Sequence, residues 1–504
     1  MSGPSEPAPF LIDQADIADF RTAITEIARA GYNESAVCGR LGLADFTDLK
    51  WKALPIYRDE HLTNRDALTL AIELFSLQGT ITESELGQLF SARSRDVLLR
   101  TGVLSIDADE KVRAHASLYP AGQRLIFSDH AWHKLPHPGF TTVPSDQVMF
   151  VGDDSRWLAR ATVRRPVRAA LDLCTGSGIH AILAAPHSER VVAVDINPRS
   201  VRCARFNAHV SGATNIEVLA GDVFEPVSAD DRFDLITANP PFVSSPVNEL
   251  MFRDGGRSGE AVQQRIVAGL PRYLAPGGIA QMVTELGERE GEPIVKRVRE
   301  WLDGAAMDIH ILRLRTYSAG YYAIGHASSD GGYGDYLEQV RSWAANLRAQ
   351  GYARVVSVLI AFQWSDPAAG APWDRVEETQ PPRRDAGAEV EAVFRAERTV
   401  RIRSRAGRLE SGWLRRTGSI AITESQVLGA KMHGPVRATL LGQALSVEHH
   451  LNPMEAGILM RLENPVPVSE LLAMAHENTA AEDAILAAVD SLQRHGLVDL
   501  TNRG

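Results

Sequence analysis

Apolar side chains recur at helical intervals near the start of the chain. In the segment DQADIADFRTAITEIARAGY they stand three or four residues apart, on one face of a predicted helix, at Ile17, Phe20, Ile24, Ile27 and Ala28. A second helical pattern covers residues 64–79. The first 140 residues are therefore predicted to form a mostly helical domain.

The end of this domain has the outline of a winged helix. Thr82 stands three residues before Glu85, the spacing of a capping box at a helix start. Residues 95–120 then predict another helix, a glycine stop and two short strands. Winged helices bind DNA in some proteins and only other proteins in others. Residues 1–150 carry 20 Asp and Glu against 14 Lys and Arg, which favours a packing or substrate-covering role.

Between residues 141 and 330 short apolar runs alternate with helical segments. This alternation is typical of an α/β fold with a mainly parallel sheet. Seven runs are predicted to be strands: residues 168–174, 190–196, 215–221, 233–239, 277–283, 307–314 and 321–327. A Gly- and Ser-rich break at residues 326–335 closes this predicted domain.

Residues 331–504 are predicted to form an α+β domain. A helix at 336–351 and a strongly apolar strand at 354–362 come first. The arginine-rich run at 380–405 alternates with apolar residues, which fits either an exposed strand or the solvated face of a helix. Residues 468–500 predict two helices and a terminal strand, a weaker version of the winged-helix outline.

Composition narrows the class of protein. The chain has 504 residues, enough for about two to four domains, and its mean hydropathy is −0.13. Neither a secretory signal nor an apolar run of membrane-spanning length is visible, so no membrane partner is expected. Three cysteines without Cys-x-x-Cys spacing argue against disulfides or structural zinc and favour the reducing cytoplasm. The net charge of −10 makes nucleic acid a less favoured partner, although an average over the chain can hide a local basic face.

A glycine-containing turn follows the first strand of the predicted sheet. In LDLCTGSGIH, Gly176 and Gly178 allow a tight turn and the close approach of a ligand to the backbone. The helix that starts at about Ile179 presents free N–H groups to an acceptor such as a carboxylate. Taken alone this pattern is weak evidence, because many α/β turns need glycine only for packing.

Acidic residues follow the next two strands. Asp195 ends the second strand, where a carboxylate can accept both hydroxyls of a ribose, and Asp222 follows the third, where one can accept an adenine amino group. Alternatively Asp195 caps the next helix, a role that Asn197 can fill instead, and Asp222 is an ordinary turn residue. The fourth strand ends in Asn-Pro-Pro-Phe at 239–242. Four such strand tips form one crevice and predict a nucleoside-type cofactor.

These motifs together resemble the class I S-adenosylmethionine-dependent methyltransferases. The resemblance rests on Asp-x-x-x-Gly-x-Gly at 172–178, on Asp195 and Asp222, and on Asn-Pro-Pro-Phe at 239–242, and it covers about residues 145–326. The subset with this last motif includes release-factor glutamine, ribosomal RNA guanine-N2 and DNA adenine-N6 methyltransferases. It implies a Rossmann-like sheet of seven strands. Cys174 departs from the pattern, because many relatives have glycine there.

The resemblance implies a role for each strand tip. S-adenosylmethionine, with S-adenosylhomocysteine as its product, would lie with its ribose on Asp195, its adenine on Ile196, and the adenine edge at Asp222 and Val223. The methionine end would lie on the first turn, at Asp172, Cys174, Thr175, Gly176 and Gly178. An upstream segment, in which relatives often close over the cofactor, makes Asp153, Asp154 and Ser155 weaker candidates.

Asn-Pro-Pro-Phe is predicted to be the catalytic motif. The Asn239 side-chain oxygen and the Pro240 carbonyl can hold the two protons of a planar amide or amino nitrogen and direct its lone pair at the methyl group. Asn239 also lies at the expected cofactor edge. Pro241, Phe242, which can stack on the planar group, and Arg253 are the expected substrate contacts. The alternative is a merely rigid turn, since two prolines fix the backbone.

The acceptor stays open at this stage. The acidic balance and the large flanking domains favour a protein, a peptide or a small natural product as acceptor over an RNA or DNA base, which is the alternative. An inactive S-adenosylmethionine-binding regulator is an alternative of another class. His449 and His450 are adjacent and lack the spacing of a metal site, so they are expected to be surface or packing residues, and no metal is predicted.

Overall fold

The N-terminal part combines short helices with small antiparallel sheets. The computed structural model describes residues 14–130, 145–247, 250–327, 332–406, 412–426, 433–475 and 478–501, so the predicted domain boundaries at 140 and 330 lie outside the described residues. The helices are α1 (Ile17–Arg29), α2 (Glu34–Leu41), α3 (Leu54–Ile56), α4 (Ala67–Ala71), α5 (Glu83–Leu89) and α6 (Ala92–Arg100). The strands are β1 (Thr80–Thr82), β2 (Leu104–Ile106), β3 (Lys111–Ala114), β4 (Ser117–Ala121) and β5 (Arg124–Ser128).

The predicted capping box is confirmed at the start of α5. The Thr82 side chain accepts from the Glu85 backbone N–H, and the Glu85 carboxylate accepts from the Thr82 N–H. Helices α5 and α6 are followed by the antiparallel pair β2 and β3, and β3 also pairs with β1. This is the predicted order of elements, while the assignment to the winged-helix class stays a prediction.

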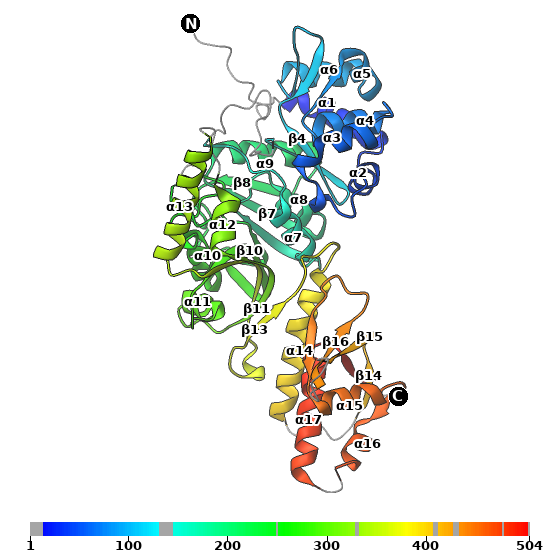
Figure 1. The fold of residues 1–504 in the computed structure, drawn as a ribbon, viewed down its shortest axis with the longest axis vertical. Coiled ribbons are helices and arrows are strands. Elements are labelled where there is room, and N and C mark those ends of the chain that lie inside the picture. Colours follow the sequence, from blue (N-terminus) through cyan, green and yellow to red (C-terminus); the bar gives the residue numbers. More distant parts are fainter. Residues whose placement is uncertain are drawn as a thin grey trace.

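A mixed sheet of eight strands occupies the middle of the molecule (Figure 1). Its order is β13–β11–β12–β10–β9–β6–β7–β8. The strands are β6 (Val167–Leu173), β7 (Ser188–Asp195), β8 (Ile216–Ala220), β9 (Phe233–Ala238), β10 (Leu274–Glu288), β11 (Met307–Ser318), β12 (Arg354–Trp364) and β13 (Asp374–Glu378). Strands β8, β7, β6, β9 and β10 run parallel, and β12 is antiparallel to both of its neighbours. The predicted α/β, Rossmann-like fold is therefore present, with eight strands in the sheet where seven were predicted.

Helices connect these strands and cover the sheet. They are α7 (Asp153–Ala161), α8 (Ile179–Ala184), α9 (Pro198–Val210), α10 (Ala261–Tyr273), α11 (Ile294–Trp301), α12 (Ala319–His326) and α13 (Tyr333–Ala349). The N-terminal part shares a core with α8 and α9, where Phe206 contacts both Phe20 and Phe127 with ring centroids 5.2 and 5.3 Å apart. The N-terminal part therefore packs on the two helices that follow β6 and β7.

Two segments at the far edge of the sheet differ from the prediction. Residues 321–327 were expected to be a strand but lie almost entirely in helix α12, where the Ser318 side chain accepts from the Tyr321 N–H and caps the helix. A short apolar run fits a strand and a buried helix equally well, so its sequence pattern did not reveal the helix. The strand expected at 354–362 exists as β12, but it lies inside the sheet between β10 and β11, whereas the prediction placed it in the C-terminal domain.

The C-terminal part combines one long helix with small sheets. It consists of α14 (Gly387–Ala406), β14 (Trp413–Arg416), β15 (Ile420–Gln426), β16 (His433–Leu440), β17 (Glu448–Leu451), α15 (Pro453–Arg461), β18 (Val466–Pro467), α16 (Val468–Ala473), α17 (Thr479–Arg494) and β19 (Val498–Thr501). The arginine-rich run lies mostly in α14, so it is a helix, and its Val390 and Phe394 are buried against the large sheet. The two helices and the terminal strand predicted at the end are α16, α17 and β19.

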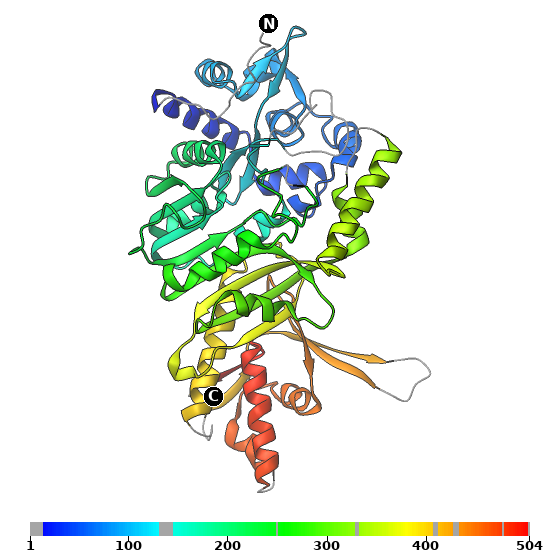
Figure 2. The same cartoon turned by 90° about the vertical axis from the view of Figure 1, so that its left-hand side faces the viewer.

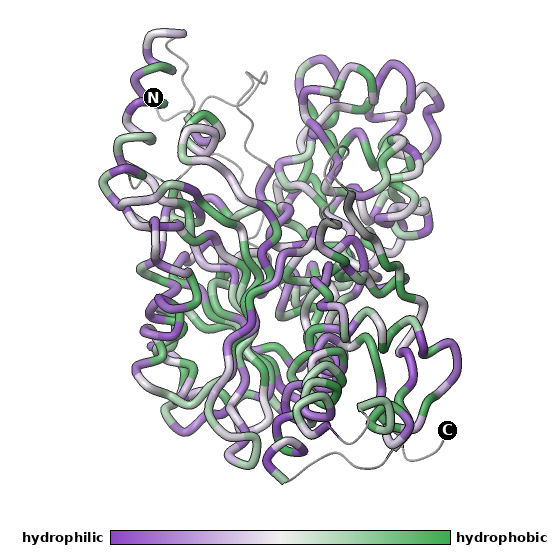
Figure 3. Tube along the Cα trace, turned by 60° about the horizontal axis from the view of Figure 1, so that its bottom comes forward, coloured by the Kyte–Doolittle hydropathy of each residue, from purple (hydrophilic) through white to green (hydrophobic). Residues whose placement is uncertain are grey.

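The three parts follow one another along the long axis (Figures 1 and 2). Apolar segments gather in the interior strands, while the outer helices carry more polar positions (Figure 3). Among the described residues, no helix combines the length and the apolar character that crossing a membrane requires.

Candidate functional site

A cavity of about 440 Å³ opens at the carboxyl ends of the central parallel strands. The strand register brings these ends level, because Leu173 pairs with both Val194 and Ala238, and Asp195 pairs with Ala220. Most of the predicted site residues line it: Cys174, Thr175, Gly176, Asp195, Ile196, Asp222, Val223, Asn239 and Pro241. Residues from the loop before α7, from α7 itself and from α10 complete the wall, among them Met149, Phe150, Ser155 and Arg265.

Hydrogen bonds to Asp172 hold together the turn between β6 and α8. This buried carboxylate accepts from the Thr175 hydroxyl at 2.5 Å, from the Thr237 hydroxyl at 2.8 Å and from the Ala181 N–H at 3.2 Å. Burial raises the pKa of Asp172 to about 7 in spite of these donors. Asp172 is not among the cavity-lining residues, so it supports the turn where the sequence predicted a ligand contact.

Gly178 also differs from its predicted role. Its φ of +82° lies in the left-handed region, and a β-carbon there would come within 3.2 Å of the Ala204 backbone in α9. This glycine therefore lets α8 pack closely on α9, and it does not line the cavity. Gly176, with φ +53° and open space where its β-carbon would stand, does line the cavity.

Two cavity residues have a left-handed backbone although they carry a β-carbon. The φ angle is +55° at Cys174 and +53° at Val223. For a β-branched residue such as Val223 this conformation is a clear outlier. Backbone strain of this kind is common at ligand sites, and two of the five non-glycine residues with a positive φ in the described part of the chain line this cavity.

Replacing Cys174 with glycine is expected to raise the free energy of unfolding by about 1 kcal/mol, because the left-handed conformation costs a β-carbon about that much. Chemical denaturation of the full chain measures it. Cys203→Gly is the matched control, since Cys203 lies within helix α9, where glycine costs about 1 kcal/mol. Equal destabilisation of both variants would contradict the assigned strain.

Asp195 ties the turn to the tip of β7. Its Oδ2 accepts from the Gly176 N–H and its Oδ1 from the Asn197 N–H, both at 2.8 Å. Burial raises the pKa of Asp195. Each oxygen keeps room for a second donor, so the carboxylate can still accept two hydroxyls from a ligand in the cavity. The predicted alternative cap is present as well, since the Asn197 side chain accepts from the Arg199 N–H and caps α9.

Asp222, which follows strand β8, has an ion-pair partner that the sequence did not predict. The Asp222 carboxylate forms an ion pair with Arg265 of α10 at 2.8 Å, and both residues line the cavity. Ile196, which also lines the cavity, is 57% exposed although it is a large apolar residue. An exposed isoleucine in a cavity wall offers a flat ligand group an apolar surface.

The Asn239 side chain has a defined orientation. Its Nδ2 donates to Asp154 Oδ2 at 2.9 Å and to Ser155 Oγ at 3.1 Å. A carboxylate only accepts, so the nitrogen of the carboxamide must face Asp154 and the oxygen must face the other way. Within the described part of the chain, no group donates to this oxygen. Burial raises the pKa of Asp154, whose interaction with Asn239 opposes that shift.

The rest of Asn-Pro-Pro-Phe is fixed by its surroundings. Pro241 lines the cavity, whereas Pro240 is buried and outside the lining. Phe242 is half-buried against a cluster of α12 and α13 that includes Tyr322 and Trp343, and it does not line the cavity either.

A glycine-rich loop closes on the backbone of the same turn. The Gly255 N–H donates to the Val243 carbonyl at 3.0 Å. A β-carbon on Gly255 would come within 2.8 Å of the Pro241 carbonyl oxygen, and one on Gly259 would collide with the Phe242 carbonyl. These glycines permit close packing that fixes the turn in place.

Arg253 is not placed in the cavity. It forms an ion pair with Asp254 at 2.7 Å, with its guanidinium over the Trp343 ring at 5.6 Å. Only Asp254 of this pair lines the cavity. The pair is largely buried, and any substrate contact of Arg253 stays a prediction.

The cavity fits the cofactor that the fold implies. Its volume lies in the range of about 300–1,000 Å³ typical of cofactor sites. Asp195 with its unused acceptor positions, the exposed Ile196 and Gly176 with open space beside it all line the cavity. S-adenosylmethionine offers ribose hydroxyls, a flat adenine and a methionine end to these three features.

Comparisons with known proteins agree with this geometry. The profile of the methyltransferase small domain family matches residues 151–298. A putative protein N5-glutamine methyltransferase of Methanocaldococcus jannaschii is 33% identical over 147 residues, which are 27% of this chain and 73% of that protein. The release factor glutamine methyltransferase of Geobacter sulfurreducens is 34% identical over 173 residues, 31% of this chain and 59% of that protein.

A relative with a different kind of acceptor is also similar. The 4-amino-L-phenylalanine/4-methylamino-L-phenylalanine methyltransferase of Streptomyces pristinaespiralis is 31% identical over 187 residues, 33% of this chain and 62% of that protein. All three matches leave most of this chain uncovered, and two of them span about three fifths of the relative's own length.

Proposed function

We propose that this chain, which belongs to the class I S-adenosylmethionine-dependent N-methyltransferases, methylates the side-chain amide nitrogen of a glutamine in a protein. The observation that carries the proposal is the orientation of Asn239. Because Asp154 and Ser155 hold its nitrogen, its oxygen is the group presented to an incoming N–H.

The fixed oxygen suits a poor nucleophile. An amide nitrogen has its lone pair delocalised into the carbonyl, so it reacts only when it is aligned and partly pyramidal. An acceptor on each N–H proton favours that geometry, and we assign these acceptors to the Asn239 Oδ1 and the Pro240 carbonyl. Since Pro240 and Pro241 have restricted backbone angles and Gly255 packs against the Pro241 carbonyl, the acceptors stay in place during the reaction.

The chain's other cavity residues would hold the methyl donor. The bound cofactor supplies a methyl group on a positively charged sulfur, already activated for transfer. Asp195 would accept the ribose hydroxyls, while Ile196 and Val223 would pack on the adenine. Asp222 would accept the adenine amino group alongside its ion pair with Arg265. Gly176, Thr175 and Cys174 would border the methionine end.

Phe242 and Arg253 would contribute from the side of α12 and α13. Phe242 is half-buried against Tyr322 and Trp343, which leaves part of its ring available to stack on a planar amide. Helix α13 is joined to the same turn, because the Asn346 Nδ2 donates to the Ser244 Oγ at 3.1 Å. We propose that this wall, next to Asn-Pro-Pro-Phe, receives the protein acceptor.

A protein acceptor is favoured by the names of two of the relatives, which act on a protein and on a release factor. The amino-acid acceptor named for the Streptomyces relative favours a small amine as the second candidate. Both acceptors present a nitrogen attached to a planar group, so the same Asn239 geometry serves either. The net charge of −10 remains the argument against RNA or DNA bases.

Transfer of a labelled methyl group tests the class of acceptor. Purified full chain and S-adenosylmethionine labelled in its methyl group are incubated separately with total protein, total RNA, total DNA and small-molecule extract. We expect protease-sensitive label in the protein fraction, and none with Asn239→Ala. Label in nucleic acid would support the base methyltransferase instead. Cofactor binding without transfer to any fraction would support a regulator.

A further inference from the structure

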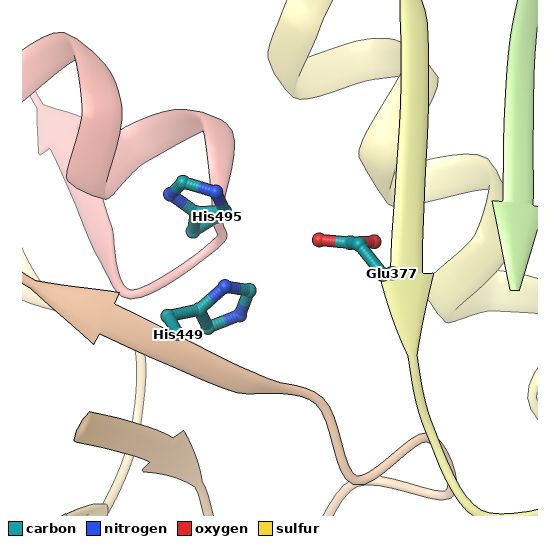
Figure 4. Close-up of side chains that lie close together, drawn as sticks. All are labelled: Glu377, His449 and His495. Carbon is teal, nitrogen blue, oxygen red and sulfur yellow. The ribbon is translucent and has the colours of Figure 1, made fainter. Parts of the chain in front are cut away.

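A second cluster of ligand-type side chains lies at the opposite edge of the large sheet. Glu377 lies on β13, His449 on β17, and His495 directly after α17, so the cluster joins three distant segments (Figure 4). One ligand atom from each residue lies within 4.8 Å of the other two. The two imidazole rings have centroids 4.3 Å apart. None of the three residues lines the cofactor cavity.

A further group orients the Glu377 side chain. The His310 Nε2 and the Glu377 Oε2 are 2.6 Å apart, which fixes one carboxylate oxygen and leaves the other available. Metal-binding histidines and carboxylates usually have such outer partners, which set the tautomer and the orientation of the ligand.

Arg375 lies beside this cluster and forms a long ion pair with Glu377, while its hydrogen bonds go to other groups. Arg375 donates to Glu397 at 2.7 Å and to the Arg494 carbonyl at 3.0 Å. Its distance to the Glu377 carboxylate is 4.0 Å, too long for a hydrogen bond. The Glu377 carboxylate faces the two imidazole rings (Figure 4).

We propose that Glu377, His449 and His495 bind one Zn²⁺ ion that joins the edge strand β13 to the C-terminal part. Two imidazoles and a carboxylate form a donor set that zinc prefers, with bonds of about 2.0–2.2 Å. A tetrahedral site with such bonds places its ligand atoms about 3.3–3.6 Å apart, a small adjustment from the observed cluster. The fourth position is left to water.

The ion would have a structural role that is independent of methyl transfer. Its ligands come from the large sheet and from two elements of the C-terminal part, and a bound ion holds these together. Because the cluster shares no residue with the cofactor cavity, losing the ion should loosen the C-terminal part and leave cofactor binding in place.

Metal titration of the tag-free full chain tests the proposal. After treatment with a chelator, the protein is titrated with Co²⁺, followed by its visible absorption, and then with Zn²⁺ in competition with a chromophoric chelator. We expect one equivalent bound in a tetrahedral site, and a higher melting temperature with Zn²⁺. His449→Ala, His495→Ala and Glu377→Gln should each weaken binding at least tenfold and remove the rise in melting temperature.

His450→Ala is the matched control. His450 is the next residue on β17, but it is exposed and points to the opposite face of the strand, so this variant should bind like the wild type. Circular dichroism checks the fold, and Glu377→Gln keeps the shape of the side chain if a histidine variant fails to fold. The proposal is overturned if the wild type binds no stoichiometric metal, or if His449→Ala and His450→Ala bind it equally.

Discussion

Asn239→Ala is expected to lower kcat for methyl transfer about 100- to 1,000-fold, the usual effect of removing one fixed polar group from a reacting atom. The variant lacks the oxygen that Asp154 and Ser155 hold in position, so the amide of the acceptor loses an alignment needed only during transfer. The affinity for S-adenosylmethionine should change less than tenfold. Initial rates with labelled cofactor and calorimetric titration measure the two quantities separately.

Two further variants make this result specific. Asp154→Ala leaves Asn239 present but removes the acceptor that orients its amide, so it should reproduce part of the loss in kcat. Asn64→Ala, at an exposed position in the N-terminal part, should leave kcat unchanged. A normal kcat in Asn239→Ala would mean that the oxygen does not contact the acceptor.

Asp195→Ala is expected to raise the Kd for S-adenosylmethionine at least about 100-fold. Each hydrogen bond to a charged acceptor contributes about 1.5–3 kcal/mol, and the variant loses two with the ribose. It also loses the bond to the Gly176 N–H, which shapes the turn at the methionine end. Isothermal titration calorimetry measures the change.

The control for this variant is Asp230→Ala. Asp230 is an exposed aspartate in the loop before β9, away from the cavity lining, and its replacement should leave the Kd unchanged. Circular dichroism of both variants separates a lost contact from a lost fold. An unchanged Kd in a folded Asp195→Ala protein would show that β7 does not bind the ribose.

The strand tips were predictable because they depend on local sequence and one general rule. Parallel strands end at the same edge of a sheet, so Asp195, Asp222 and Asn239 could be placed around one crevice from the sequence. The structure brings all three to one cavity. The Asn239→Ala and Asp195→Ala variants test the roles of two of them toward acceptor and cofactor.

What the sequence did not reveal depends on contacts between distant segments. Asp172 was expected to face the ligand, but Thr237 on the neighbouring strand and Thr175 engage its oxygens beneath the turn. The ion pair of Asp222 required knowing which face of α10 turns toward β8. His449 lacked any nearby ligand in the sequence, and only the fold places Glu377 and His495 beside it.

The sequence did not predict that β12 and β13 belong to the large sheet, and the reason is related. Pairing of β12 with β10 and β11 is antiparallel and follows two intervening helices, so no local pattern marks that strand as part of the sheet. Strand β13 then adds to β11 as an eighth strand. The resemblance at residues 145–326 could not indicate either strand, because both lie beyond it.

The chemical identity of the methylated atom tests the central claim most directly. The labelled acceptor protein is isolated, digested and analysed by mass spectrometry that locates the methyl group within a residue. The account predicts one added methyl group on the side-chain amide nitrogen of a glutamine, absent with Asn239→Ala. A methyl group on oxygen, on carbon or on a lysine or arginine nitrogen would contradict it.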